Sequence, residues 1–104
     1  IPLAWDLARG RRLRIAREDA GLSRACLVHS AVISEWRLRL LESGRRREIM
    51  PGTLSRASRR LGKRLGYCPL DLEAWIMLGS EWGVPWRMAA RSRVAQARGG
   101  ANLG

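Results

Sequence analysis

Residues Gly21–Gly44, GLSRACLVHSAVISEWRLRLLESG, give the clearest indication of the fold. This stretch contains two short segments of helical periodicity joined by the segment AVI. Ser23 is placed to cap a helix over residues 24–30, and Ser34 to cap a helix over residues 35–43, because a serine side chain accepts a hydrogen bond from the free amides at a helix start. The stretch therefore predicts two helices joined by a tight turn.

Helical periodicity continues on both sides of this stretch. We expect further helices over residues 7–20 and 53–61, a strongly apolar one opened by Pro69, and a C-terminal one over residues 85–97. Gly62 is expected to end the helix before it. Phe is absent, β-branched residues are few, and no stretch alternates long enough to predict a strand. The pattern is that of an all-α protein.

The charge is strongly unbalanced. The chain has 20 Lys and Arg residues against 9 Asp and Glu residues, a formal net charge of +11 at pH 7. A protein this basic most often binds a polyanion, because neutralising phosphates releases counterions. The charge indicates nucleic acid as a class of partner, but it does not distinguish DNA from RNA.

Several other classes of protein are disfavoured. Cys26, Cys68 and His29 cannot supply the full ligand set of a structural zinc site, and we interpret the cysteines as small, partly buried thiols in a reduced compartment. His29 has no nucleophile and carboxylate at a suggestive spacing, so we expect no enzyme, no metal and no cofactor. No apolar run reaches the length of about 18 residues typical of a membrane span. We expect a cytoplasmic, nucleoid-associated protein.

The opening stretch resembles the helix-turn-helix of the phage lambda repressor and Cro-like (Xre) family. The matching positions, in register without a gap, are Gly21, Leu22, Ser23, Leu27, Ala31, Ile33, Ser34, Leu38, Leu41, Glu42 and Gly44. GRRLRIARED upstream is similar to the first helix of the family, and PGTLSRASRRLG downstream to its fourth, so the resemblance covers residues 10–62. It implies a bundle of about five helices, here with an added C-terminal helix, in which helix two crosses the DNA backbone and helix three enters the major groove.

The resemblance divides the chain and assigns its residues. Residues 7–66 would form the helix-turn-helix DNA-binding domain, residues 67–98 the C-terminal helices, and residues 99–104 a flexible tail. Periodicity turns Leu38 and Leu41 inward, so that the opposite face of helix three is free to contact DNA. The candidate DNA-binding residues come from the start of helix two, from the cap and outward face of helix three, and from the loop that follows it. They are Arg24, Ser34, Glu35, Trp36, Arg37, Arg39, Leu40, Arg45, Arg46 and Arg47. The family also pairs Glu42 with an arginine of helix one, here Arg17.

Two features depart from the family pattern. Val32 stands in the turn where the family usually has a small residue, which suggests a turn that is slightly opened or strained. Trp36 and Leu40 form an apolar stripe where polar residues are usual, and this stripe could contact thymine methyl groups, fold back into the core, or bind a protein.

The C-terminal segment over residues 67–98 is rich in apolar residues that a four-helix core does not need. These residues are Trp75, Ile76, Leu78, Trp82 and Trp86. We expect helices five and six to form a homodimer interface, the alternative being that helix six covers its own domain. The sequence thus predicts a sequence-specific regulator, a repressor, that binds double-stranded operator DNA as a homodimer. The alternatives are an antitoxin or adaptor that binds a protein through the same scaffold, and a structural RNA-binding component.

Overall fold

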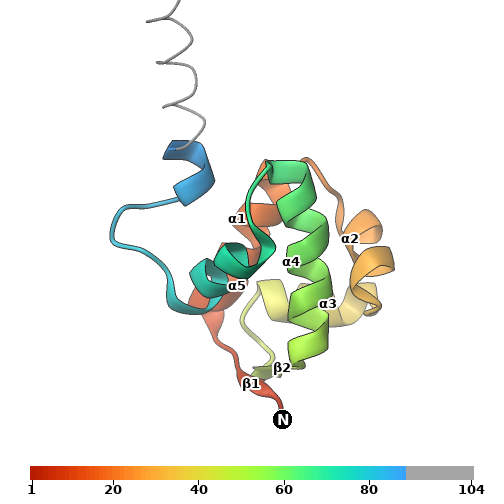
Figure 1. Cartoon of the computed structure of the whole chain (residues 1–104). Coiled ribbons are helices and arrows are strands. Elements are labelled where there is room, and N and C mark those ends of the chain that lie inside the picture. Colours follow the sequence, from red (N-terminus) through yellow and green to blue (C-terminus); the bar gives the residue numbers. More distant parts are fainter. Residues whose placement is uncertain (89–104) are drawn as a thin grey trace, which may run out of the picture.

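The computed structural model describes residues 1–88 and is mostly helical (Figure 1). The elements in chain order are β1 (Leu3–Ala4), α1 (Leu7–Asp19), α2 (Arg24–Ala31), α3 (Glu35–Glu42), β2 (Glu48–Ile49), α4 (Pro51–Leu65) and α5 (Pro69–Leu78). Residues 85–88 are again helical, in agreement with a helix opened by Pro85. The remainder of that expected helix, and the tail over residues 99–104, lie outside the described residues.

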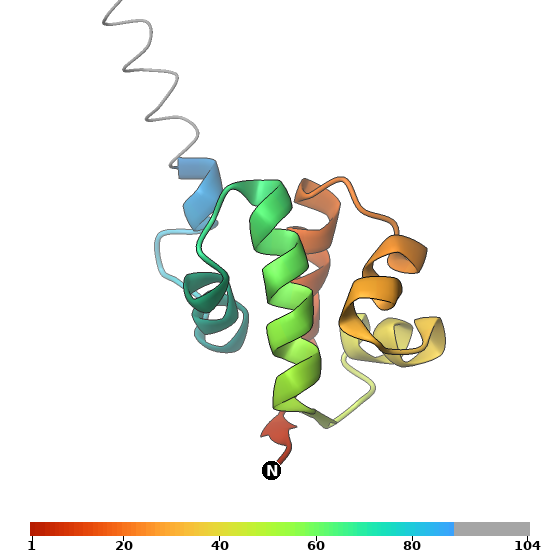
Figure 2. The same cartoon turned by 45° about the vertical axis from the view of Figure 1, so that its right-hand side comes forward.

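The helices pack around α4, which lies in the middle with α5 on one side and α2 on the other (Figure 2). Helix α1 lies behind α4 in this view and contacts α3, α4 and α5. The largest fully buried apolar side chains come from every helix: Leu13, Leu27, Leu41, Leu61, Leu72 and Ile76. A single hydrophobic core therefore extends from the N-terminal segment to α5 and beyond, and α5 belongs to the same folded unit as the helix-turn-helix.

Helix α4 is longer than the sequence predicts. The expectation that it covers residues 53–61 and ends at Gly62 is wrong, because α4 runs from Pro51 to Leu65. A Cβ atom on Gly62 would lie 2.6 Å from the Tyr67 carbonyl oxygen, so this glycine allows the chain after the helix to pack closely against it. The helix ends instead at Gly66, which has the left-handed φ of +65° that glycine adopts without strain.

The expectation that the chain has no strand is also wrong. β1 and β2 form a small antiparallel sheet in which Leu3 pairs with Ile49 and Ala4 with Glu48. Trp5, directly after β1, is buried, and its Nε1 donates a hydrogen bond of 2.9 Å to the Leu41 carbonyl oxygen. The sheet and this indole hold the N-terminal segment against the end of α3.

The large apolar residues of α5 and the segment after it divide into an inner and an outer set. Trp75 and Trp86 are buried and pack edge to face, with ring centroids 4.7 Å apart. Ile76 is fully buried. These residues complete the core of their own chain, which corrects the expectation that all of the set forms a dimer interface. Leu78 and Trp82 remain exposed, at 81% and 79%.

Candidate nucleic-acid interface

The two helices of the opening stretch are capped as the sequence predicts. Ser23 Oγ accepts a hydrogen bond of 3.2 Å from the Cys26 amide, and Ser34 Oγ accepts one of 3.1 Å from the Arg37 amide. The turn between them places Val32 at φ 54°, the only left-handed residue other than glycine within residues 1–88. A β-branched side chain disfavours this conformation, so the turn is strained.

Helix α3 presents one face to the core and the other to solvent. Leu38 and Leu41 are buried, as the periodicity predicts. The exposed face carries Glu35, Trp36, Arg37 and Arg39, while Leu40 is half-buried. Trp36 is 67% exposed, so the interpretation that it folds back into the core is wrong. The face is therefore basic with one large apolar side chain in it.

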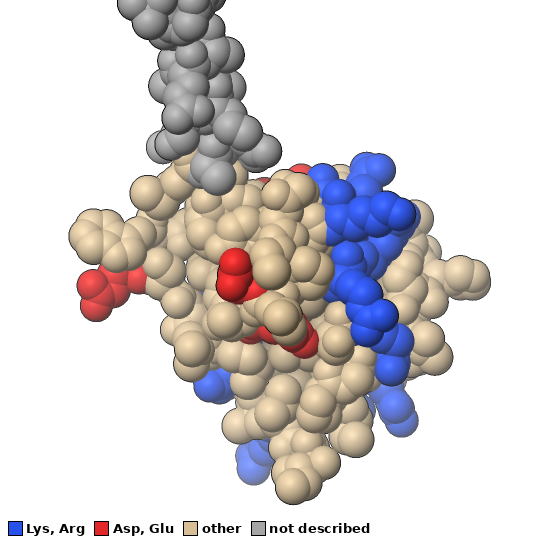
Figure 3. Space-filling view, in the orientation of Figure 1, with Lys and Arg blue, Asp and Glu red and all other residues tan. Residues whose placement is uncertain are grey.

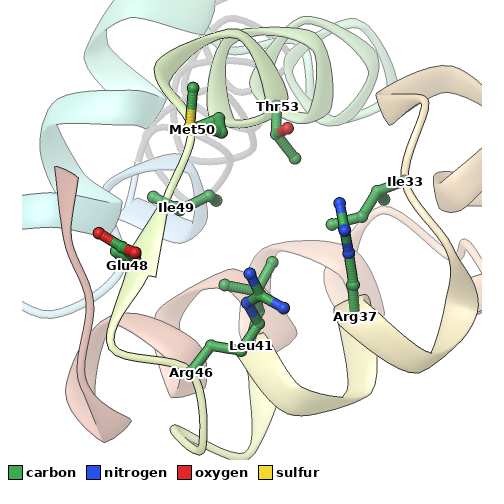
Figure 4. A pocket seen from close by; sticks show the side chains of 8 residues that line it. All are labelled: Ile33, Arg37, Leu41, Arg46, Glu48, Ile49, Met50 and Thr53. Carbon is green, nitrogen blue, oxygen red and sulfur yellow. The ribbon is translucent and has the colours of Figure 1, made fainter. Parts of the chain in front are cut away.

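Two arginines converge beside the start of α4. Arg37 from α3 and Arg46 from the following loop point into a hollow whose far wall includes Thr53 (Figure 4). Met50, the residue before α4, makes no side-chain hydrogen bond to the helix start. The first amides of a helix carry partial positive charge, which adds to that of the guanidinium groups. Glu48 also lines this hollow, but the two guanidinium groups and the helix start outweigh its single negative charge, so the hollow favours an anion such as a phosphate.

The remaining candidates on α3 and the loop are accessible. Arg39 Nη2 donates a hydrogen bond of 3.1 Å to Glu35 Oε1 one turn earlier, an exposed ion pair. Arg45 and Arg47 are exposed on the loop. Glu35 therefore has an ordinary structural role within the helix, and the loop arginines are free to meet a ligand.

A buried carboxylate connects α3 to the helices behind it. Arg17 Nε and Nη2 donate to the two carboxylate oxygens of Glu42 at 2.7 and 2.9 Å, so the ion pair that the resemblance implies is present. Arg24 Nε also donates to Glu42, at 3.2 Å, an interaction that sequence reasoning missed. The Arg24 side chain is still 32% exposed. Glu42 thus fixes the start of α2 and the end of α3 against α1.

Sequence reasoning also missed what brings α1 and α3 together. Glycine has a low helix propensity, so Gly10 disfavours a helix at this position. In the structure it is buried in α1, where a Cβ atom would overlap the Leu41 carbonyl oxygen of α3. The glycine therefore sets how deeply α3 sits in the domain. Its only sequence signal is its placement inside an otherwise helical pattern.

The other polar candidates do not form a site. Cys26, Cys68 and His29 are exposed, which corrects the expectation of partly buried thiols, and Cys68 precedes α5 whereas Cys26 and His29 lie on α2. Over residues 1–88 no group of three or more His, Cys, Asp or Glu side chains is arranged to hold a metal ion. Among the helices that the structure describes, none is long and apolar enough to cross a membrane.

Comparison with protein-family models, with curated proteins and with solved structures finds no match to this chain.

Proposed function

We propose that the protein is a sequence-specific, double-stranded-DNA-binding regulator of the lambda repressor-like kind, a repressor that acts as a homodimer by occluding a promoter. The observation that carries this proposal is the outward face of α3. Arg37 is exposed there and, within residues 1–88, forms no side-chain ion pair. A basic helix face that the fold does not use is available for a ligand.

The size and chemistry of this face suit the major groove. Helix α3 has 8 residues, and a helix is narrow enough to enter a groove about 12 Å wide. An arginine can donate two parallel hydrogen bonds to guanine O6 and N7, which makes Arg37 our candidate for base recognition. Trp36 lies beside it and can contact a thymine methyl group.

Phosphate contacts would flank the helix on both sides. Arg24 at the start of α2, with its Nε held by Glu42, can direct its terminal nitrogens to one strand. Arg46, with the positively polarised start of α4, can bind the other strand, and Arg45 and Arg47 lie on the same loop. Such contacts fix the orientation of a protein on a duplex without reading its sequence.

Two single substitutions test the proposal after a preferred site has been selected from random duplexes. Arg37→Ala should reduce discrimination between that site and random DNA by about 1 to 3 kcal/mol. Arg46→Ala should weaken binding to both about equally and flatten the salt dependence by about one unit of slope. Binding is measured by gel shift over a range of salt. An unchanged specificity ratio for Arg37→Ala would show that α3 does not read bases through this residue.

The exposure of Trp36 supports a second candidate, an antitoxin or adaptor that binds a protein through α3. An exposed aromatic side chain is typical of protein interfaces. Trp36→Ala should lower DNA affinity, most of all on sites with thymine at the contacted step, if the face binds DNA. Normal DNA binding with loss of a co-purifying protein would favour the adaptor instead.

A further inference from the structure

Helix α4 carries a second basic surface that the proposed function does not use. Its sequence, PGTLSRASRRLGKRL, contains no acidic residue. Its cations, which we call the α4 stripe, are Arg56, Arg59, Arg60, Lys63 and Arg64. They lie opposite the buried face of the helix, which is formed by residues such as Leu54 and Leu61. Figure 3 shows Lys and Arg atoms as a band over the region where Figure 1 places α4 and α2.

The α4 stripe is not neutralised by the rest of the described chain. None of its cations forms an ion pair with a carboxylate within residues 1–88. Arg56 Nε and Arg64 Nε donate to the carbonyl oxygens of Ala31 and Ala20, at 2.9 and 3.1 Å, and so fasten α4 to its neighbours. Like charges this close repel one another unless a ligand neutralises them.

The stripe also borders a hollow between α4 and α2. This open hollow has a volume of about 410 Å³, and it is lined by Ser30, Arg56, Arg59, Arg60 and Lys63. Its lining contains no acidic or aromatic side chain. The Arg60 Nε atom is buried and has no hydrogen-bond partner within residues 1–88. The surface offers donors for an anion but no aromatic side chain on which a base could stack.

The stripe leads away from the face of α3. Thr53, in the first turn of α4, shares a hollow with Arg37. Lys63 lies ten residues further along the same helix, which is about 15 Å at the helical rise of 1.5 Å per residue. A duplex held by α3 would therefore meet the beginning of α4, while the rest of the stripe would remain open to another ligand.

We propose that the α4 stripe binds the phosphodiester backbone of a second segment of duplex DNA. Guanidinium groups match phosphate oxygens with paired hydrogen bonds, and all but one of the cations are arginines. The absence of aromatic side chains in the hollow favours a duplex backbone over single strands, which bind through stacking. This proposal rests on the proposed function for the first duplex, but the charge of the stripe can be tested independently of α3.

The test compares two charge-matched double variants of the full chain. Arg59→Gln with Lys63→Gln removes two exposed cations of the stripe, and Arg11→Gln with Arg14→Gln removes two exposed cations of α1. Circular dichroism verifies that both remain folded. For the salt titration, both are placed in a background of Arg37→Ala with Arg46→Ala, which weakens binding through α3, and binding of random-sequence duplex is then titrated over a range of salt. The stripe variant should lower the slope of log K against log salt by about 2, since each phosphate contact contributes about 0.9, and the α1 variant should leave it unchanged.

A capture assay tests the second segment directly. Protein is bound to a duplex tethered on beads, and a labelled second duplex is added. The wild type and the α1 variant should capture it, and the stripe variant should capture several-fold less at equal bound protein. Full capture by the stripe variant would overturn the proposal, as would an equal loss in the α1 variant, which would indicate net charge alone. Preferential displacement of the labelled duplex by single-stranded RNA would also overturn it. The salt titration does not depend on α3, so failure of the proposed function leaves that readout unaffected and the two proposals fail separately.

Discussion

At position 42 a single carboxylate accepts hydrogen bonds from Arg17 of α1 and Arg24 of α2. Glu42 is only 5% exposed, and Arg17 also donates to the Leu22 carbonyl oxygen between α1 and α2. Buried charges are tolerated only when they are paired and hydrogen-bonded. The placement of α3 therefore depends on Glu42 as well as on apolar packing.

Removing this carboxylate should destabilise the fold strongly. Glu42→Leu leaves Arg17 buried without its partner and should lower the free energy of unfolding by about 3 to 5 kcal/mol. Arg17→Met added to Glu42→Leu should recover much of the loss. Glu35→Leu, which breaks the exposed pair with Arg39, is the matched control and should cost less than about 1 kcal/mol. Urea unfolding measures all of these, and a small effect of Glu42→Leu would contradict the prediction.

Asp19 gives the fold a dependence on pH. Its carboxylate accepts hydrogen bonds from Arg87 and from Trp86 Nε1, and these, Arg87 first, lower the pKa of Asp19 below its ordinary value. A lowered pKa in the folded state stabilises the fold above the unfolded pKa of about 3.9, and this contribution is lost as the pH falls through the folded pKa.

Asp19→Asn should therefore be less stable than the wild type at neutral pH. The difference should shrink below about pH 4, where the wild-type carboxyl group becomes protonated and so loses its negative charge, like the neutral asparagine. Unfolding followed by tryptophan fluorescence over a series of pH values measures this difference. If the difference in the free energy of unfolding stayed constant down to acidic pH, the charge of Asp19 would not hold residues 86 and 87.

Among the elements, the turn between α2 and α3 is the strained one. Val32 is exposed, so its side chain gains little from packing, but its φ of 54° is unfavourable for a β-branched residue. Val32→Gly should raise the free energy of unfolding by up to about 1 kcal/mol. Ser30→Gly, within α2, is the control and should lower it by about 0.5 to 1 kcal/mol. Equal losses in the two variants would argue against strain at Val32.

Most of the elements could be predicted from the sequence. The start of α1, the caps of α2 and α3, and the opening of α5 by Pro69 follow from local signals that the structure confirms. The sheet could not be predicted, because each strand has 2 residues and shows no alternation. The length of α4 could not be predicted, because a glycine at position 62 is a typical helix end by local pattern, whereas in the structure it allows close contact with the residues that follow the helix.

The candidate site could be predicted from local sequence patterns only in part. Periodicity alone assigns the outward face of α3, because the inward Leu38 and Leu41 determine it. The bond from Arg24 to Glu42 and the approach of α4 to Arg37 depend on tertiary packing, and no local pattern encodes them.

For the whole molecule, the exposed apolar surface of α5 and the residues after it supports the proposed homodimer. Leu78 and Trp82 lie four residues apart in the sequence and both are exposed, and exposed apolar patches commonly mark interfaces. Leu78→Glu with Trp82→Glu should convert the dimer to a folded monomer in sedimentation experiments. Met50→Glu, at an exposed apolar position elsewhere, should not. Deleting α5 is unsuitable as a test because it would remove buried Leu72 and Ile76. A dimer that persists in the double variant would place the interface elsewhere.

The separation between the two faces of α3 allows them to evolve independently. Its inward face and Glu42 are joined to α1 and α2, so a change there would be tested by selection for folding. Trp36 and Arg37 point outward and are exposed. Substitutions at these outward positions should be close to neutral for stability. A lineage carrying this scaffold could therefore exchange them and drift to new ligands without first acquiring compensating mutations.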